Sequence, residues 1–285
     1  MMHLNRPLRS VLYIPASKTR ALEKARTLPV DAIIFDLEDA VAPDEKAAAR
    51  GALADALDAG GYGARLKIVR INGLDTEWGG EDAAAAREMG ADAILLPKVN
   101  GADHLDALAA ITGEVPLWAM METPLGMMNA SEIAAHAFCA GLVMGTNDLA
   151  KDMGTRFRPD RLPLLTGLGL CLLAAKAQGI AIVDGVYNAF KDQEGLEAEC
   201  AQGRDMGFDG KTLIHPAQVD VANAAFSPTG EEIDLAARQI TAYEAAVAAG
   251  QAVAVVDGRI VENLHVATAR ETLAKVEAIR ALNPE

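Results

Sequence analysis

Eight short apolar segments recur along the first 225 residues, and behind each one apolar residues continue at helical spacing. Strands of a parallel sheet are buried on both faces, so they read as continuous apolar runs alternating with helices. Gly or Pro stands before several of the runs, where a preceding helix should stop. The number of units and their total length predict an eight-fold β/α (TIM) barrel. The expected strands are 11–14, 31–37, 66–71, 92–96, 115–121, 138–144, 180–183 and 211–214.

A different pattern begins after the last of these units. The segment FSPTG at 226–230 is the best linker in the chain, and Asp257-Gly258 is a strong two-residue turn signal inside 251–260. We expect helices at 231–249 and 263–282 on either side of that hairpin. The predicted organisation is therefore a barrel over 1–225 and a C-terminal lid or oligomerisation segment over 226–285. The helices expected to surround the barrel strands are 17–27, 44–59, 77–89, 102–111, 126–135, 163–178, 193–206 and 217–225.

Composition limits the partners. Hydrophobic residues make up 51% and aromatic residues 4%, so the core must be built from Ala, Val, Ile and Leu, and the net charge is −14. An acidic surface argues against nucleic acid or an anionic membrane as partner. The three cysteines are far apart and form no CxxC pair, and no segment resembles a signal peptide or a membrane span. These features predict a soluble cytoplasmic protein.

Two acids follow successive predicted strands. Glu122 comes directly after the run 115–121, and Asp148 follows the run 138–144, 26 positions later (148 − 122). Because active sites of parallel barrels lie at the carboxyl ends of the strands, both acids should point into one mouth. Two carboxylates there repel each other unless a cation lies between them, and Mg²⁺ accepts one or two protein carboxylates. The alternative is that each acid only stabilises the start of a helix.

Nearly every other predicted strand also ends in a polar residue, as an active-site mouth requires. Arg70 suits bidentate binding of a substrate carboxylate, although it could instead pair with Asp36 or Glu38 for structural reasons. Lys98 could bind a substrate anion or neutralise the acids, and His215 is expected to be structural. The polar residues at strand ends are Ser17, Lys18, Asp36, Glu38, Asp39, Arg70, Asn72, Lys98, Glu122, Asn147, Asp148, Asp184 and His215.

These motifs, in this order and over nearly the whole chain, resemble the citrate lyase β-subunit-like enzymes of the HpcH/HpaI aldolase superfamily. That group includes malyl-CoA and citramalyl-CoA lyases. The matching segments are RSVLYIPA at 9–16, FDLEDAVAPDEKAAAR at 35–50, VRIN at 69–72, LLPKV at 95–99, METP at 121–124, GTNDLAKDMG at 145–154 and GKTLIHPAQ at 210–218.

The resemblance implies a Mg²⁺ site, with Mn²⁺ as a substitute, held by Glu122 and Asp148. It implies that Arg70 holds substrate oxygens, with Glu122 and Lys98 beside the substrate, and that Asp36 in the acidic motif orders Arg70 and the waters of the metal. It also implies a small-molecule CoA thioester as substrate and a homotrimer or homohexamer. The residues that fall in the CoA-contacting region of relatives are Arg9, Ser10, Lys18, Arg20 and Lys24.

One departure from the lyases concerns the C-terminal segment. After the Asp257-Gly258 turn the lyases carry an Asp that acts as acid or base, and the matching residue here is Glu262. The preferred expectation is C–C bond cleavage of malyl-CoA, β-methylmalyl-CoA or citramalyl-CoA into acetyl- or propionyl-CoA and glyoxylate or pyruvate. Glu262, one methylene longer, instead suits a base that activates water, so a (3S)-malyl-CoA thioesterase is the first alternative. A citrate lyase β-subunit working with an acyl carrier partner is the second.

Overall fold

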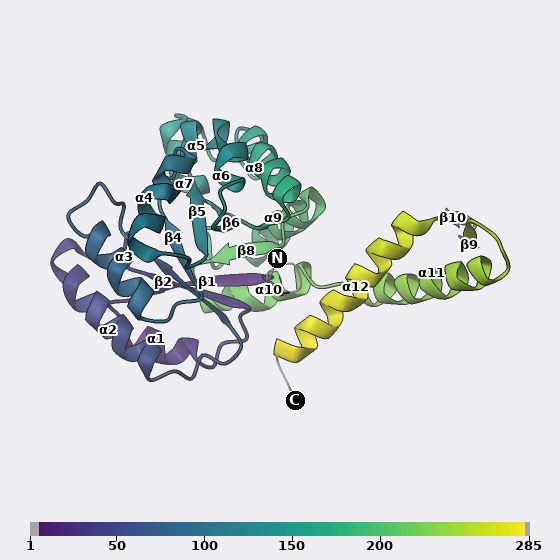
Figure 1. Ribbon diagram of the computed structural model, residues 1–285, viewed down its shortest axis with the longest axis horizontal. Coiled ribbons are helices and arrows are strands. Elements are labelled where there is room, and N and C mark those ends of the chain that lie inside the picture. Colours follow the sequence, from purple (N-terminus) through teal and green to yellow (C-terminus); the bar gives the residue numbers. More distant parts are fainter. Residues whose placement is uncertain (1–5, 283–285) are drawn as a thin grey trace. The chain divides into compact units, whose positions relative to one another are not determined.

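The computed structural model describes residues 6–282, and its larger unit is a closed barrel of eight parallel strands surrounded by helices (Figure 1). Each strand pairs with the next in chain order, and β1 pairs with β8 to close the barrel, with Ser10 opposite Lys211. The predicted TIM-barrel fold is confirmed. The strands are β1 (Ser10–Pro15), β2 (Ala32–Asp36), β3 (Leu66–Arg70), β4 (Ala93–Leu96), β5 (Leu117–Met121), β6 (Cys139–Met144), β7 (Ala181–Asp184) and β8 (Gly210–Leu213).

The alternation of side chains along each strand decides what fills the barrel. Successive residues of a strand point to opposite faces, and Ile34 and Ile68 belong to the apolar cluster inside the barrel. Asp36 and Arg70 come two residues later on β2 and β3, so they share the inward direction. Glu122 stands two residues beyond Met120 of the same cluster. The polar residues at these strand ends are therefore the top layer of the barrel interior.

A second apolar cluster, made mainly of Leu, Ile, Val and Ala, joins the outer faces of the strands to the helices. Two local expectations are corrected. The single helix expected at 126–135 is two short helices that meet at Asn129, and an additional helix, α7, follows β6, so Asp148 lies in a helix. The helical segments around the barrel are α1 (Thr19–Ala25), η1 (Pro43–Glu45), α2 (Lys46–Asp58), α3 (Gly79–Glu88), α4 (Ala102–Thr112), α5 (Pro124–Met128), α6 (Ala130–Ala134), α7 (Thr146–Asp152), α8 (Leu165–Gln178), α9 (Gln193–Met206), η2 (Pro216–Gln218) and α10 (Val219–Ala225).

A buried ion cluster connects β7 and β8 with the surrounding segments. The Asp184 carboxylate accepts hydrogen bonds from Arg161 Nη1 at 2.8 and 2.7 Å, and Lys211 Nζ lies 3.3 Å from Asp184 and 2.6 Å from Glu199. Asp184 and Lys211 are both fully buried. Val183 belongs to the cluster inside the barrel, so the next residue, Asp184, faces outward. Its assignment to the barrel mouth was wrong, because it is one residue out of phase.

The chain forms a second compact unit that begins at Ser227. It contains α11 (Gly230–Ala248), the strands β9 (Ala254–Val256) and β10 (Arg259–Val261), and α12 (Asn263–Leu282). In Figure 1 the two helices lie side by side, with the hairpin joining them at one end. The hairpin turns at Asp257 and Gly258, both with positive φ as a type I′ turn requires. The predicted hairpin and both helices are confirmed.

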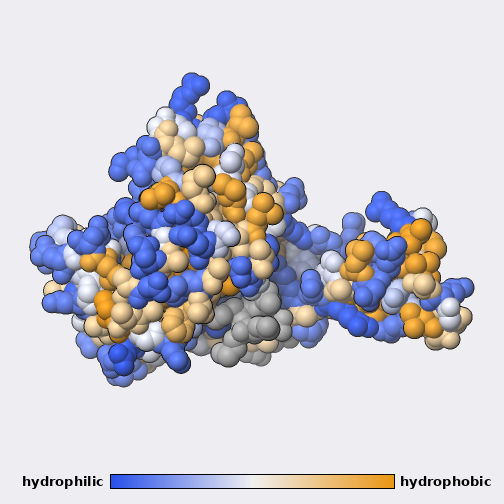
Figure 2. Space-filling view, turned by 45° about the horizontal axis from the view of Figure 1, so that its top comes forward, coloured by the Kyte–Doolittle hydropathy of each residue, from blue (hydrophilic) through white to orange (hydrophobic). Residues whose placement is uncertain are grey.

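Apolar side chains remain on the surface of this unit, where Figure 2 shows orange among blue. Val253, Val255, Ile260 and Leu264 are all exposed there. Inside the unit, Arg238 binds both carboxylate oxygens of Asp257 at 2.8 Å, which ties the hairpin to α11. The role of this unit as a lid or an oligomer contact stays a prediction. None of the described helices is both long and apolar enough to cross a membrane.

Closure of the barrel leaves no room for a side chain at the start of β8. A Cβ built on Gly210 would overlap the backbone carbonyl of Leu8. We expect Gly210→Ala to lower the free energy of unfolding by about 3 kcal/mol, because the backbone just before β1 must shift to admit the methyl group. Urea unfolding followed by circular dichroism measures this.

Gly51 in α2 provides the matched control, since a Cβ there meets nothing within 4 Å. Gly51→Ala should raise the free energy of unfolding by roughly 0.5–1 kcal/mol, because alanine loses less backbone entropy in a helix. Equal stabilities of the two variants would contradict the steric account of closure.

Candidate active site

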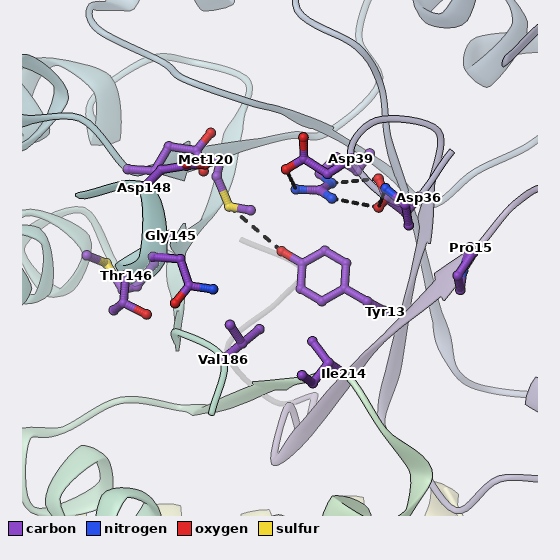
Figure 3. Close-up of a pocket in the computed structure, with 15 residues that line it drawn as sticks. Tyr13, Pro15, Asp36, Asp39, Met120, Gly145, Thr146, Asp148, Val186 and Ile214 are labelled. Atoms are coloured by element: carbon purple, nitrogen blue, oxygen red, sulfur yellow. Dashed lines mark hydrogen bonds and ion pairs between the residues drawn. The ribbon is translucent and has the colours of Figure 1, made fainter. Parts of the chain in front are cut away.

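A cavity of about 500 Å³ opens at the carboxyl ends of the barrel strands (Figure 3). Acids, one arginine and several apolar side chains face it, as the strand-end pattern predicted. The residues that line it are Tyr13, Pro15, Asp36, Asp39, Ala40, Arg70, Met120, Glu122, Met144, Gly145, Thr146, Asn147, Asp148, Val186 and Ile214.

The Arg70 guanidinium and the Asp36 carboxylate form a bidentate pair in this cavity. Arg70 Nε and Nη2 donate to the two Asp36 oxygens at 2.7 and 2.6 Å, and Arg70 is only 7% exposed. Asp36 also accepts from the backbone N–H groups of Glu38 and Ala40. Burial alone would lower the pKa of Arg70, but the charge of Asp36, its hydrogen bond and the neighbouring Tyr13 and Glu38 together outweigh burial and raise that pKa well above its usual range. Arg70 is thus a permanent, oriented cation at the mouth.

Glu38 and Lys98 extend this charge web. Glu38 Oε2 lies 2.9 Å from Arg70 Nη1, and Lys98 Nζ donates to Glu38 Oε1 at 3.0 Å. Burial raises the pKa of Glu38, and the two cations oppose that rise. Lys98 has a φ of 51°, and its backbone N–H donates to Glu122 Oε1 at 2.8 Å. The contact of Lys98 with Glu38 is what neutralisation of the acids requires, and its role in binding a substrate anion stays a prediction.

Glu122 is a buried carboxyl without an ion-pair partner in the part of the chain described. It is 2% exposed, and its pKa rises to about 8 because of burial first, then the charge of Glu38, with a smaller contribution from Asp148. Glu122 fits here because residue 145 is a glycine: a Cβ at Gly145 would overlap the Glu122 side chain. A cation beside this group would remove the cost of its ionisation.

Asp148 reaches the same cavity from the first turn of α7 and is half-buried. Residues 6–282 contain no group of three or more His, Cys, Asp or Glu side chains arranged to hold a metal. Two carboxylates facing one cavity nevertheless suit Mg²⁺, which completes its octahedron with water and substrate oxygens. Glu122 and Asp148 therefore have the donor chemistry and the location for a hard divalent cation.

Tyr13 is a cavity residue that the sequence reasoning missed. It stands two residues after Val11, which belongs to the cluster inside the barrel, so it faces inward. The Arg70 guanidinium carbon lies 5.0 Å from the centre of the Tyr13 ring, and the Tyr13 hydroxyl is 3.8 Å from Met120 Sδ. Within an apolar run, a tyrosine looks like another core residue. Only its position along β1, two residues after the inward-facing Val11, indicates that it points into the barrel mouth.

The predicted CoA-contacting residues fall into two groups. Arg9 precedes β1, at the opposite end of the barrel, and donates to Asp31 at 2.8 and 2.9 Å. It is 5% exposed and Ser10 is fully buried, so the structure brings neither residue to the mouth. Lys18 follows β1 at the mouth side and is exposed, with Glu45 3.8 Å away. Arg20 and Lys24 are exposed on α1 (Thr19–Ala25).

Glu262 and His215 lie in different units of the chain. Glu262 lies on the second unit and is exposed, and its backbone N–H donates to His265 Nδ1 at 3.0 Å at the start of α12. That contact uses the backbone and leaves the carboxylate to other partners. His215 Nδ1 accepts from the Ala217 N–H, and its ring stacks on Phe190, contacts that a structural role requires.

A family model described as HpcH/HpaI aldolase/citrate lyase matches residues 9–216. The chain belongs to this family. A second model, a C–C bond lyase of the TIM-barrel fold, matches residues 163–278. The family resemblance expected from the motifs is confirmed, and the matches extend past the barrel into the second unit.

Three relatives show how close other members of the HpcH/HpaI family are. A protein of Cereibacter sphaeroides (strain KD131) named (3S)-malyl-CoA thioesterase is 66% identical over 281 residues, 99% of each chain. Citrate lyase subunit beta of Escherichia coli (strain K12) is 36% identical and covers 95% of this chain and 94% of its own. The crystal structure of CitE from Mycobacterium tuberculosis, in complex with magnesium, acetoacetate and coenzyme A, has a TM-score of 0.81 and 29% identity over 96% of this chain and 99% of its own.

The raised pKa of Glu122 predicts how stability depends on pH once divalent cations are removed. The folded chain keeps the proton of Glu122 up to about pH 8, whereas the unfolded chain loses it near the ordinary glutamate pKa of 4.5. Between these values the folded state binds more protons, so the free energy of unfolding falls as pH rises, by up to about 1.4 kcal/mol per pH unit. Glu122→Gln has no proton to lose, and its stability should decline less over this range.

Urea midpoints of the wild type and Glu122→Gln, in chelator at about pH 5.5, 7 and 8, measure the difference. The margin by which the variant exceeds the wild type should grow steadily from the lowest pH to the highest. Parallel curves for the two proteins would show that Glu122 ionises normally in the folded chain.

Proposed function

We propose that this chain is a Mg²⁺-dependent thioesterase that hydrolyses (3S)-malyl-CoA to malate and free CoA. The 66% identity over 99% of both chains to the protein named (3S)-malyl-CoA thioesterase carries the proposal. Glu262 in place of the lyases' Asp is the second support, because a longer carboxylate suits activation of water. The preference for C–C cleavage drawn from the sequence is therefore reversed in favour of its first alternative.

Glu122 and Asp148 are the proposed ligands of Mg²⁺, with Mn²⁺ as a substitute. A buried carboxyl whose pKa has risen to about 8, facing a second carboxylate across one cavity, fits a divalent cation well. Mg²⁺ bound there would supply Lewis-acid polarisation of substrate oxygens and charge balance for the two acids. The CitE structure of the same family contains magnesium and coenzyme A.

Arg70 is the proposed anchor for the malyl carboxylate. Its guanidinium lines the cavity and is already oriented by the bidentate Asp36 pair. A pre-oriented cation binds an anion with little further loss of side-chain freedom, so the thioester is held in one place. Asp36 acts through Arg70 and so positions it. Lys98 compensates Glu38 and, through its backbone N–H, orients Glu122 beside the substrate.

Glu262 is the proposed general base. It takes a proton from water as the water oxygen bonds to the thioester carbonyl carbon, and the C–S bond then breaks to release the CoA thiolate. In the homotrimer or homohexamer that the resemblance implies, we propose that Glu262 of one subunit lies at the barrel mouth of a neighbouring subunit. Lys18, Arg20 and Lys24 are exposed cations that remain candidates for the CoA phosphates, whereas buried Arg9 does not.

Cleavage of a C–C bond is the second candidate, because the lyase model matches residues 163–278, which include β7, β8 and Glu262. The substrates would be malyl-CoA, β-methylmalyl-CoA or citramalyl-CoA, and the same Arg70 and metal site would serve. Action as a citrate lyase β-subunit with an acyl carrier partner draws support from the 36% identity to the Escherichia coli subunit. Tight binding of free CoA would count against that third role.

Product analysis tests the proposal. Purified protein with (3S)-malyl-CoA and Mg²⁺ should release CoA thiol and malate in equal amounts, without glyoxylate, and EDTA should stop the reaction. The thiol, malate and glyoxylate are followed together in one assay. Glyoxylate with intact acetyl-CoA would instead establish the lyase, and the absence of any Mg²⁺-dependent product would refute both activities.

The length of the Glu262 side chain is the second test. Glu262→Gln removes the base and should lower kcat by roughly 10²–10⁴-fold while CoA binding, measured by calorimetry, is retained. Glu262→Asp keeps a carboxylate but withdraws it by about 1 Å, which should lower hydrolysis roughly 10²-fold. Unchanged kcat in Glu262→Gln would remove this residue from the mechanism.

A further inference from the structure

The Tyr13 hydroxyl is a polar group of the cavity wall that has only a weak partner. Tyr13 is half-buried, and a tyrosine hydroxyl in a partly buried site normally has a firm hydrogen-bond partner. Here, within the part of the chain described, it meets only Met120 Sδ, at 3.8 Å. A thioether is a weak acceptor, so the O–H group is free to turn to a stronger one. Pairing with protein therefore does not account for this hydroxyl.

The ring of Tyr13 is held in place. It contributes to the wall of the cavity and packs beneath the Arg70 guanidinium, with 5.0 Å between the guanidinium carbon and the ring centre. Figure 3 shows the ring in the middle of the drawn residues, with its hydroxyl directed toward Met120. Arg70 is itself fixed by Asp36. A donor on a fixed ring costs little reorganisation when charge develops beside it.

The hydroxyl also stays protonated. Burial raises the pKa of Tyr13 well above its ordinary value; Arg70 opposes the rise, and the carboxylates of Asp36, Glu122 and Glu38 add to it. Over the whole range in which such an enzyme works, Tyr13 is thus a neutral hydrogen-bond donor and not a base.

We infer that Tyr13 is a catalytic residue whose hydroxyl donates a hydrogen bond to the thioester carbonyl oxygen of the substrate. The inference rests on the proposed function. As water bonds to the carbonyl carbon, the carbonyl electron pair moves to this oxygen, and the hydrogen bond strengthens with its charge. When the carbonyl re-forms, the C–S bond breaks and CoA leaves as the thiolate. The phenol proton remains on Tyr13 throughout.

The same role extends to the second candidate reaction. Cleavage of the C–C bond leaves its electron pair on a thioester enolate, whose charge rests on the same carbonyl oxygen. The assignment of Tyr13 therefore depends on a CoA thioester in this cavity and not on which of the two bonds is broken.

The competing interpretation is that Tyr13 only packs against Arg70. Tyr13→Phe separates the two, because it keeps the ring and removes the hydroxyl. Tyr62→Phe is the matched control, since the Tyr62 hydroxyl donates to the Leu22 carbonyl at 3.2 Å and lies outside the cavity. Melting curves and circular dichroism of both variants establish that they are folded.

We expect Tyr13→Phe to lower kcat by about 10²-fold with KM changed only a few-fold, as loss of one oxyanion donor does elsewhere. The factor by which Tyr13→Phe lowers kcat should be the same at every pH, and the variant should need the same Mg²⁺ concentration as the wild type. Tyr62→Phe should keep kcat. A Tyr13→Phe enzyme with the wild-type kcat would overturn the inference, as would the loss of one limb of its pH profile, which would indicate proton transfer.

The outcomes separate the two proposals. If the wild type and Tyr13→Phe convert malyl-CoA equally well, only the proposed role of Tyr13 is refuted. A wild type that neither hydrolyses nor cleaves malyl-CoA sinks the proposed function, and the role of Tyr13 with it.

Discussion

Negative charge concentrated at the mouth of the barrel has to be compensated, and the bidentate pair of Arg70 with Asp36 is where compensation begins. Three carboxyl groups, Asp36, Glu38 and Glu122, are buried at this end of the barrel. Arg70 balances the first two and Lys98 assists at Glu38. Among residues 6–282, Glu122 accepts a hydrogen bond only from a backbone N–H, and burial together with the charge of Glu38 raises its pKa. The described residues therefore provide no ion-pair partner for Glu122, at the place where a divalent cation is proposed.

Much of this arrangement follows from the sequence, because buried parallel strands have apolar runs and expose their ends at one face. This pattern predicts the barrel and the location of Asp36, Arg70 and Glu122 at the cavity. It failed at Asp184 and at Tyr13 for one reason. The pattern of polar residues at strand ends carries no information on the alternation of inward and outward side chains, so it included the outward Asp184 and missed the inward Tyr13.

Other features had no signal in a single sequence. The short helix α7, which carries Asp148, follows β6 at once, and the apolar pattern does not mark its start. Arg9 lies in a matching motif, yet its position before β1 puts it at the far end of the barrel with Asp31. The hairpin of the second unit was predictable because Asp257-Gly258 is a local turn signal. A turn encoded by two neighbouring residues was thus easier to predict than the face of a strand, or the end of the barrel, on which a residue lies.

The account depends most directly on Glu122 and Asp148 acting together as a cation site. Titration with Mn²⁺, followed by electron paramagnetic resonance, tests this without any assay of activity. The wild type should bind one Mn²⁺ per chain, Mg²⁺ should displace it, and Asp148→Asn should weaken binding by at least about 10-fold. A wild type that binds no Mn²⁺, or an Asp148→Asn protein that binds it unchanged, would contradict the account.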